Sequence, residues 1–330
     1  MSLNKTDTEA IARSSTQAVR TRRRFDGAWL ARNGVYMALI ALVIINIVIT
    51  PHFVSVANLR LQLIQTAPVL IVALGMALVI GTKGIDLSVG SVMALSAAVM
   101  PLYIGYGTIP AILIGVAFGA VTGYIAGTLV ARLGLQPIVA TLAIMVGGRG
   151  LANVIGGQIK NLNDPGLVAL GSGSLFGIPY TVLIAALLLL LVMFVVRRTT
   201  FGRALEAVGG NPLASQLAGL RIKRVLTYVY IISGVFAAIA GVLVAAKSQA
   251  SDPRTLGLLI ELSAIAAVVI GGTPLSGGKI RVVGTLAGAL LMQLIISTLV
   301  AHNIADSVAQ MVQAGVIIVA VYVQLGRKSR

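Results

Sequence analysis

The chain has 330 residues, of which 58% are hydrophobic and 10% are charged, and its mean hydropathy is +0.99. A water-soluble domain of this length cannot bury so much apolar surface, so the composition excludes a soluble protein and indicates several membrane spans. Lysine and arginine outnumber aspartate and glutamate by 25 to 9, and the absence of cysteine excludes disulfides, thiolate metal sites and cysteine nucleophiles.

The chain starts with a polar stretch, residues 1–32, in which arginines crowd the approach to the first apolar segment. It is too long and too polar to be the start of a signal peptide, and no small-residue cleavage motif follows the apolar run. We therefore expect a cytoplasmic tail at 1–32, a transmembrane domain at 33–326 and a short cytoplasmic end at 327–330.

Continuous apolar runs predict an all-α polytopic membrane protein with about ten transmembrane helices, whereas a β-barrel would show weak alternating segments. We place the spans at 34–50, 63–82, 87–106, 109–131, 137–156, 179–196, 225–247, 258–272, 281–301 and 307–325.

The basic residues indicate how these spans are oriented. With a cytoplasmic N-terminus, all but five of the 25 basic residues fall in cytoplasmic segments; the five are Arg60, Arg149, Lys160, Lys247 and Arg254. This imbalance is typical of inner-membrane proteins, and it explains the positive charge without nucleic acid. Both termini are predicted to be cytoplasmic.

A polar break, Val79 to Ser91, separates the second and third spans. Charged residues here must face water, a partner or a substrate path. In a structural interpretation, Gly81 and Gly84 end one helix, and Asp86 or Ser88 caps the next. In a functional one, the N–H groups of the helix start face a polar solute.

Glycines recur every four residues in the fourth span, at Gly115, Gly119, Gly123 and Gly127. Such spacing lets helices approach closely, so we expect this span to lie deep in the bundle.

A short sequence pattern occurs twice in the chain, and this repetition favours two pseudo-repeated halves. Val79-Ile-Gly followed by Leu87-Ser-Val-Gly resembles Val269-Ile-Gly followed by Leu275-Ser-Gly-Gly, and each precedes another apolar span. Transporters are commonly built from such repeats, with the path at their interface.

The longest loop predicted to be cytoplasmic, 197–224, contains a short helix. Gly209 and Gly210 stop one helical stretch, Asn211 is a good N-cap for the next, Pro212 suits its first turn and Gly219 suits the position past its end. Its apolar face would carry Leu213, Leu217 and Leu220. Because so short a helix is marginal alone, it either packs under its own spans or docks into another protein.

Polar residues inside the predicted spans are candidates for a translocation path, because each is costly in lipid unless it faces water or a partner. They are Gln65, Thr66, Arg149, Asn153, Glu261, Ser263 and Gln293. For Arg149 and Glu261, a structural ion pair between two spans is the alternative.

Neither a metal site nor a nucleotide site is predicted. His52 and His302 lack the close His, Asp or Glu neighbours of a metal centre. The segment 272–280 lacks both the first glycine and the Ser/Thr of a phosphate-binding loop, so we interpret it as a turn.

Four motifs resemble a known family: GIDLSVG at 84–90, QPIVATLAIMVGGRG at 136–150, EAVGGNPLASQLAG at 206–219 and VVIGGTPLSGG at 268–278. Together they are similar to the permease subunit of bacterial ABC sugar importers of the ribose, xylose and galactofuranose type. The linker 157–179 looks closest to the galactofuranose branch.

The resemblance implies a non-enzymatic inner-membrane permease for a monosaccharide, working by alternating access. The implied partners are a second permease subunit, identical or a sister, a cytoplasmic ABC ATPase with tandem domains, which would use the ATP and Mg²⁺, and a periplasmic sugar-binding protein. Membrane lipid would surround the permease, and no cofactor is expected on this chain itself.

The resemblance also assigns residues. The family signature falls on Gly84, Asp86, Leu87, Ser88 and Gly90. The helix that couples the permease to its ATPase falls on Glu206, Ala207, Gly210, Asn211, Pro212, Leu213, Leu217 and Gly219.

Two alternatives stay open. An ion-coupled secondary transporter would use Asp86 or Glu261 as a proton or sodium site. A related ABC permease would carry nucleosides or branched-chain amino acids.

Overall fold

The computed structural model describes residues 27–325. The contacts between residues divide the chain into two units, the first ending at Gly34 and the second beginning at Val35. Of the first unit only residues 27–34, the start of helix α2, are described, so the predicted tail at 1–32 lies almost wholly outside the described residues, as does the predicted end at 327–330. The packing below is that of the second unit, which begins at Val35.

All ten predicted apolar segments form helices, and this confirms the all-α fold. Their bounds are α2 (Gly27–Ile49), α3 (Val56–Gly81), α4 (Val89–Tyr103, extended by the 3-10 turn Ile104–Tyr106), α5 (Thr108–Ala131), α6 (Pro137–Gly156), α8 (Tyr180–Arg198), α11 (Ile222–Ser248), α12 (Ile260–Ile270), α13 (Val282–Ala301) and α14 (Asp306–Leu325).

Among the described residues, seven of these helices are long and apolar enough to cross a membrane. The other three have shorter apolar stretches, at Asn33–Ile49, Ile260–Ile270 and Ser307–Val319. With 11 residues, α12 is about 16 Å long. It therefore reaches only about half way across a hydrocarbon core of about 30 Å.

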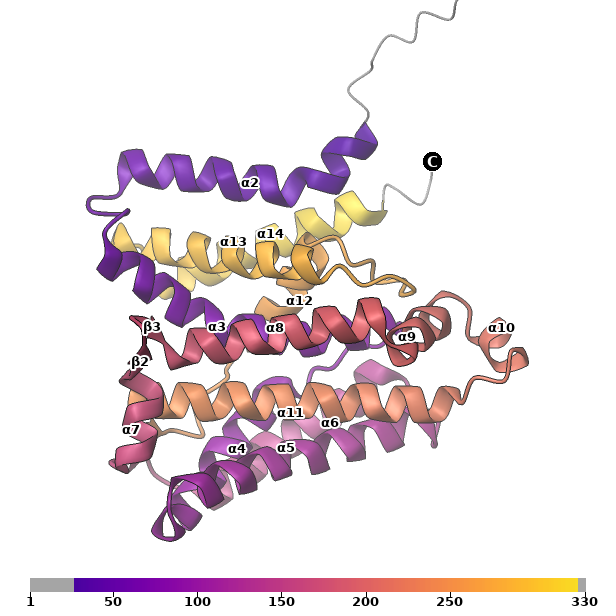
Figure 1. Ribbon diagram of the computed structural model, residues 1–330, viewed down its shortest axis with the longest axis horizontal. Coiled ribbons are helices and arrows are strands. Elements are labelled where there is room, and N and C mark those ends of the chain that lie inside the picture. The colour runs from indigo at the N-terminus through magenta and orange to yellow at the C-terminus, as the bar shows by residue number, and fades with distance from the viewer. Residues whose placement is uncertain (1–26, 326–330) are drawn as a thin grey trace, which may run out of the picture. The chain divides into compact units, whose positions relative to one another are not determined.

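Short elements join the long helices at two opposite ends. One end carries the polar breaks 82–88 and 271–281 together with α9 (Thr200–Gly210) and α10 (Pro212–Leu217), and we name it the α10 end (Figure 1). At the other end lie α7 (Pro165–Ser172) and two small antiparallel sheets, in which β1 (Lys160–Asn161) pairs with β4 (Ala250–Ser251) and β2 (Ser174–Leu175) with β3 (Ile178–Pro179). We name it the sheet end.

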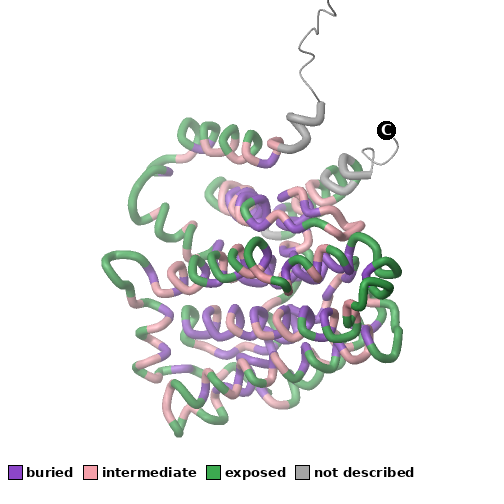
Figure 2. Tube along the Cα trace, turned by 45° about the vertical axis from the view of Figure 1, so that its right-hand side comes forward, coloured by how far each residue is buried: buried purple, intermediate pink, exposed green. Residues whose placement is uncertain are grey.

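The most buried helices are α3, α4 and α11. Side chains such as Leu74 and Met76 of α3 and Tyr230 and Leu243 of α11 are at most 1% exposed. Figure 2 shows the same pattern as purple segments along the inner helices. Because α3 and α4 border the first polar break, that break is held on both sides by the core.

Three of the glycines of α5, Gly119, Gly123 and Gly127, pack against α11 and Gly115 packs against α4, but the prediction that α5 lies deep in the bundle is wrong. A Cβ added at Gly123 would stand 2.4 Å from the carbonyl oxygen of Tyr230. The other face of α5 is open, with Leu113 62% and Val121 56% exposed. Close contacts with α11 and α4 on one face, rather than burial on all sides, account for the repeat.

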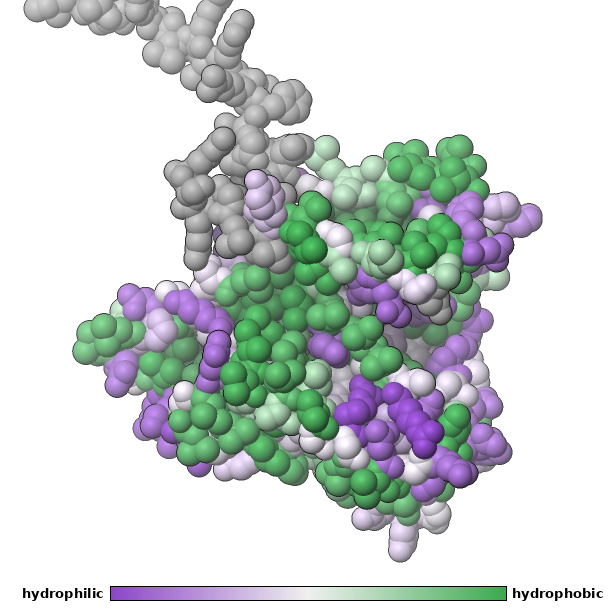
Figure 3. All heavy atoms as spheres, turned by 180° about the vertical axis from the view of Figure 1, so that it is seen from behind, coloured by the Kyte–Doolittle hydropathy of each residue, from purple (hydrophilic) through white to green (hydrophobic). Residues whose placement is uncertain are grey.

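Apolar side chains are also exposed on other helices, such as Val48, Val154 and Leu187. Figure 3 shows hydrophobic residues across the middle of one face and hydrophilic residues toward its ends. A lipid-facing belt accounts for this distribution.

Basic side chains are unequally distributed over the two ends. The α10 end and the helix termini that reach it carry Lys83, Arg132, Arg197, Arg198, Arg203, Arg221, Lys223, Arg224, Lys279 and Arg281. The sheet end carries Arg60 in the second turn of α3, Lys160, Lys247 in the last turn of α11, and Arg254.

Candidate functional site

The short helix α10 forms as its capping residues predict. The side chain of Asn211 accepts a hydrogen bond from the backbone N–H of Ala214, and Pro212 occupies the first helical position. Gly219, just past the end, has a φ of 82°, which L side chains rarely adopt. Local sequence alone therefore sets where this helix begins and ends.

The apolar face of α10 is left without a partner in the described chain. Leu213 is 68% exposed and Leu217 82% exposed, whereas Leu220, just after the helix, packs on the core. This exposure contradicts the first alternative, in which the short helix packs under the membrane spans of its own chain.

Helix α9, which leads into α10, is bonded to both polar breaks. The Glu206 carboxylate accepts a hydrogen bond from the backbone N–H of Ile280 at 3.1 Å. Lys83 donates to the carbonyl oxygen of Gly210 at 3.2 Å. The two breaks are also joined to each other, because the N–H of Gly278 donates to the carbonyl oxygen of Gly81 at 2.9 Å. We name these contacts the junction.

Glycine is required where these backbones meet. A Cβ added at Gly209 would lie 1.8 Å from the carbonyl oxygen of Gly81 and 2.6 Å from the nitrogen of Gly278. By contrast, one added at Gly210 would find its nearest neighbour at 4.0 Å. The backbone of α9 is therefore in direct contact with both breaks.

The structure corrects two expectations for the first break. Gly81 ends α3 as expected, but Ser88 makes no side-chain cap bond for α4. Asp86 does not face water, since it is 1% exposed.

Asp86 instead fixes the break to the core. Its carboxylate accepts hydrogen bonds from the N–H and hydroxyl of Ser88 and, on the other oxygen, from the hydroxyl of Ser233 in α11. Burial raises the pKa of this carboxyl, and the hydrogen bonds from Ser88 and Ser233 lower it.

The glycines of the family signature are positions of close packing. A Cβ at Gly84 would meet the hydroxyl of Tyr230 at 2.6 Å, and one at Gly90 would meet the carbonyl oxygen of Gly257 at 2.4 Å. Leu87, which lies between them in the sequence, is partly buried.

The ion pair between Arg149 and Glu261, the structural alternative to a role in the path, is not formed in the described chain. Arg149 donates instead to the carbonyl oxygens of Pro253 and Leu256, at 3.1 and 2.7 Å. The Oε2 atom of Glu261, which is 8% exposed, has no hydrogen-bond partner among the described residues. Asn153, one turn from Arg149, is exposed. Arg149 therefore fixes the loop before α12.

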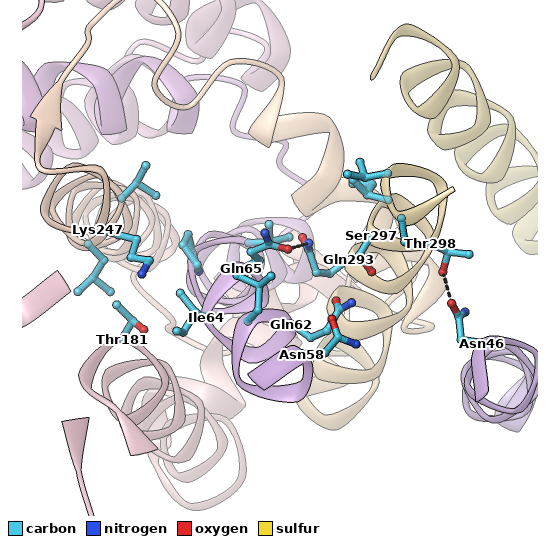
Figure 4. A pocket seen from close by; sticks show the side chains of 18 of the residues that line it. Asn46, Asn58, Gln62, Ile64, Gln65, Thr181, Lys247, Gln293, Ser297 and Thr298 are labelled. Carbon is cyan, nitrogen blue, oxygen red and sulfur yellow. Dashed lines mark hydrogen bonds between the residues drawn. The ribbon is translucent and has the colours of Figure 1, made fainter. Parts of the chain in front are cut away.

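Two of the path candidates meet, although they are 228 residues apart: Gln293 of α13 donates to the side-chain oxygen of Gln65 of α3 at 2.9 Å. Both line a cavity of about 680 Å³ at the sheet end, shown in Figure 4. The other candidates lie elsewhere. Thr66 is buried and donates to the carbonyl oxygen of Gln62, while Ser263 accepts from Gln313 of α14.

Sequence reasoning missed two residues of this cavity, Asn58 and Gln62. The second span was predicted to begin at 63, but α3 begins at Val56, so both are helical. With Gln65 they follow the i, i+4, i+7 spacing of one helix face, a pattern already present in the sequence.

Histidines and acids do not form a metal site in the described chain. No three His, Cys, Asp or Glu side chains are grouped there. His302 contacts the hydroxyl of Thr50 at 3.4 Å.

Comparison with known proteins identifies the family. Residues 58–321 match the family described as branched-chain amino acid transport system / permease component. The galactofuranose transporter permease YtfT of Escherichia coli K12 is 38% identical over 93% of this chain and 92% of the relative.

Two further relatives are named as import permeases for other sugars. The ribose import permease RbsC of the same strain is 37% identical over 94% of this chain and 98% of its own. The fructose import permease FruF of Bifidobacterium longum is 43% identical over 72% and 68%. No significant match to a solved structure was found. The chain belongs to the family of multi-pass inner-membrane permease subunits of bacterial ABC sugar importers, whose members are not themselves catalytic.

Proposed function

We propose that this permease carries a monosaccharide inward by alternating access, and that a cytoplasmic ATPase drives it by docking on α10. The observation that supports this most is the combination of an unpartnered apolar face on α10 with the bonds that join α9 to both polar breaks. A force applied at α10 would reach α3, α4, α12 and α13 through the junction, because those helices begin or end at the breaks.

The charge distribution supports a cytoplasmic α10 end. Among the described residues, ten basic residues lie at that end, compared with four at the sheet end, and by the positive-inside rule such an excess faces the cytoplasm. Ten spans are an even number and would return the chain to the side on which it started, so both chain termini would be cytoplasmic. The sheet end would then face the periplasm and a sugar-binding protein.

The names of the relatives favour a sugar as cargo, since the curated relatives described above are permeases for galactofuranose, ribose and fructose. The description of the family model leaves branched-chain amino acids as the alternative. An ion-coupled carrier is disfavoured by family membership and by the hydrogen bonds that occupy both oxygens of Asp86.

The remaining partners follow from the same proposal. A second permease subunit, identical or a sister, would complete the membrane part, with lipid around it. ATP and Mg²⁺ would be used by the ATPase, which we expect to carry two domains in tandem.

The test is a change on α10 in the assembled importer, with ATPase and binding protein present. Leu213→Ser combined with Leu217→Ser removes the exposed apolar face without altering the caps of the helix. We expect sugar-stimulated ATP hydrolysis to fall at least tenfold, while the amount of permease in the membrane is unchanged.

The matched control is Leu133→Ser, which changes a leucine that is 66% exposed on the same end of the molecule. It should leave stimulation within about twofold of the unmodified importer. Equal stimulation in the double variant and in this control would refute docking through α10.

A further inference from the structure

We infer that the cavity at the sheet end is a binding site for an uncharged polyhydroxyl solute, a sugar rather than an amino acid. This inference rests on the proposed function and names the place where the permease takes up its cargo. The cavity, of about 680 Å³, lies within the range of about 300 to 1,000 Å³ that small-molecule sites occupy.

Polar side chains of α3 form one wall. Asn58, Gln62 and Gln65 lie at i, i+4 and i+7 and all line the cavity (Figure 4). A stripe of three amides on a membrane helix is costly against lipid, so it needs water, protein or a solute in front of it.

The wall formed by α13 is also polar. Gln293 and Ser297 lie one turn apart, and Thr298 beside them donates to the side-chain oxygen of Asn46 in α2 at 2.9 Å. Together with the bond between Gln293 and Gln65, these contacts give the cavity both amide donors and carbonyl acceptors. Sugar hydroxyls donate and accept in the same way, so they match such a surface.

The charges that line the cavity favour a sugar over an amino acid as its occupant. Lys247 is the one charged side chain among the described residues that line the cavity, and none of those residues carries a carboxylate. An amino acid would bring a buried ammonium group with no acid to pair it, and an unpaired charge is expensive in such a place. An uncharged sugar avoids this cost.

Weak binding is expected from the composition of the walls. Phe53 is the one aromatic residue among the described lining residues, and it is itself 7% exposed. The cavity therefore offers hydrogen bonds but little aromatic surface on which a sugar ring would stack, which suits a site that must release its solute.

The absence of cysteine makes a direct test possible, since an introduced cysteine is the sole thiol of this chain and its labelling is measured on the separated permease. In the full importer reconstituted in liposomes, Gln62→Cys and Ser297→Cys would each be labelled with a small cationic methanethiosulfonate. Labelling would be followed with millimolar D-ribose, D-fructose, L-arabinose or D-galactose, and with L-leucine. The matched control is Phe176→Cys, which lies at the same end, outside the cavity, and is 95% exposed.

We expect at least one of the sugars to slow labelling of both cavity cysteines fivefold or more, with no effect from leucine and none on the control. Protection by leucine alone, or by none of the solutes, would overturn the inference. So would a sugar effect of equal size on the control, or cavity cysteines that never react.

A second measurement separates this site from the coupling helix. Gln65→Leu with Gln293→Leu removes the amide pair and should lower sugar uptake at least tenfold, while the amount of permease in the membrane is unchanged. Unchanged uptake would refute the site. If uptake is unchanged in this variant but the α10 variant loses sugar-stimulated ATP hydrolysis, the binding site is refuted and the docking proposal stands. The two proposals can therefore fail independently.

Discussion

The Glu206 carboxylate in α9 accepts a hydrogen bond from the backbone N–H of Ile280, in the break between α12 and α13. The two residues are 74 positions apart in the chain. This bond connects the segment that carries α10 to a break in the membrane bundle, so α9 cannot shift without straining or breaking it.

Replacing Glu206 tests whether this bond transmits motion. Glu206→Gln keeps a side-chain oxygen as acceptor and should retain most of the coupling. Glu206→Lys replaces the acceptor with a donor beside an N–H, which leaves that N–H unsatisfied at a cost of about 1 to 3 kcal/mol.

We therefore expect Glu206→Lys to abolish sugar-stimulated ATP hydrolysis in the assembled importer while the permease still accumulates in the membrane. Equal stimulation by the lysine and glutamine variants would show that the bond plays no part in coupling.

Gly209 and Gly210 provide a matched pair in the same helix. Gly209→Ala forces a Cβ to within 1.8 Å of the Gly81 carbonyl oxygen, whereas Gly210→Ala finds open space. Overpacking of this kind costs about 1 to 3 kcal/mol. We expect the first variant to lower uptake at least tenfold and the second to stay within twofold. Transport assays in membrane vesicles would measure both, and similar uptake in the two variants would contradict the contact.

Asp86 tests whether charge is needed in the first break. Burial raises the pKa of its carboxyl, so its ionised form costs more in the fold than in the unfolded chain. The contribution of Asp86 to the free energy of unfolding is therefore fully present below the carboxyl pKa of the unfolded chain. It falls as pH rises through the raised pKa of the folded protein.

Asp86→Asn removes that pH dependence and keeps an oxygen to accept from Ser88. We expect unchanged uptake and a thermal unfolding temperature equal to or above that of the unmodified protein at neutral pH. Asp86→Leu, which leaves Ser88 and Ser233 without their acceptor, should be less stable by about 1 to 3 kcal/mol. Loss of uptake in a folded Asp86→Asn variant would show that the charge itself is required.

Gly123 tests the contact between α5 and α11. Gly123→Ala would place a Cβ 2.4 Å from the carbonyl oxygen of Tyr230, while Gly147→Ala in α6 meets nothing within 4 Å. We expect the first to lower the unfolding temperature in detergent by several degrees, because about 1 to 3 kcal/mol of overpacking is introduced. The second should be neutral, and equal unfolding temperatures would argue against close packing of α5 on α11.

Residue type and spacing determined much of this protein. Ten apolar runs gave ten helices, and Asn211, Pro212 and Gly219 bounded α10, because hydrophobicity, capping and φ preferences act within a few residues. The family was also evident from short contiguous motifs.

The tertiary structure decided which distant groups meet. It joined Gln65 to Gln293, Glu206 to Ile280 and Asp86 to Ser233. It also directed Arg149 to backbone carbonyls instead of Glu261. Such contacts depend on how whole helices pack and rotate, and residue spacing along one helix does not specify its partner.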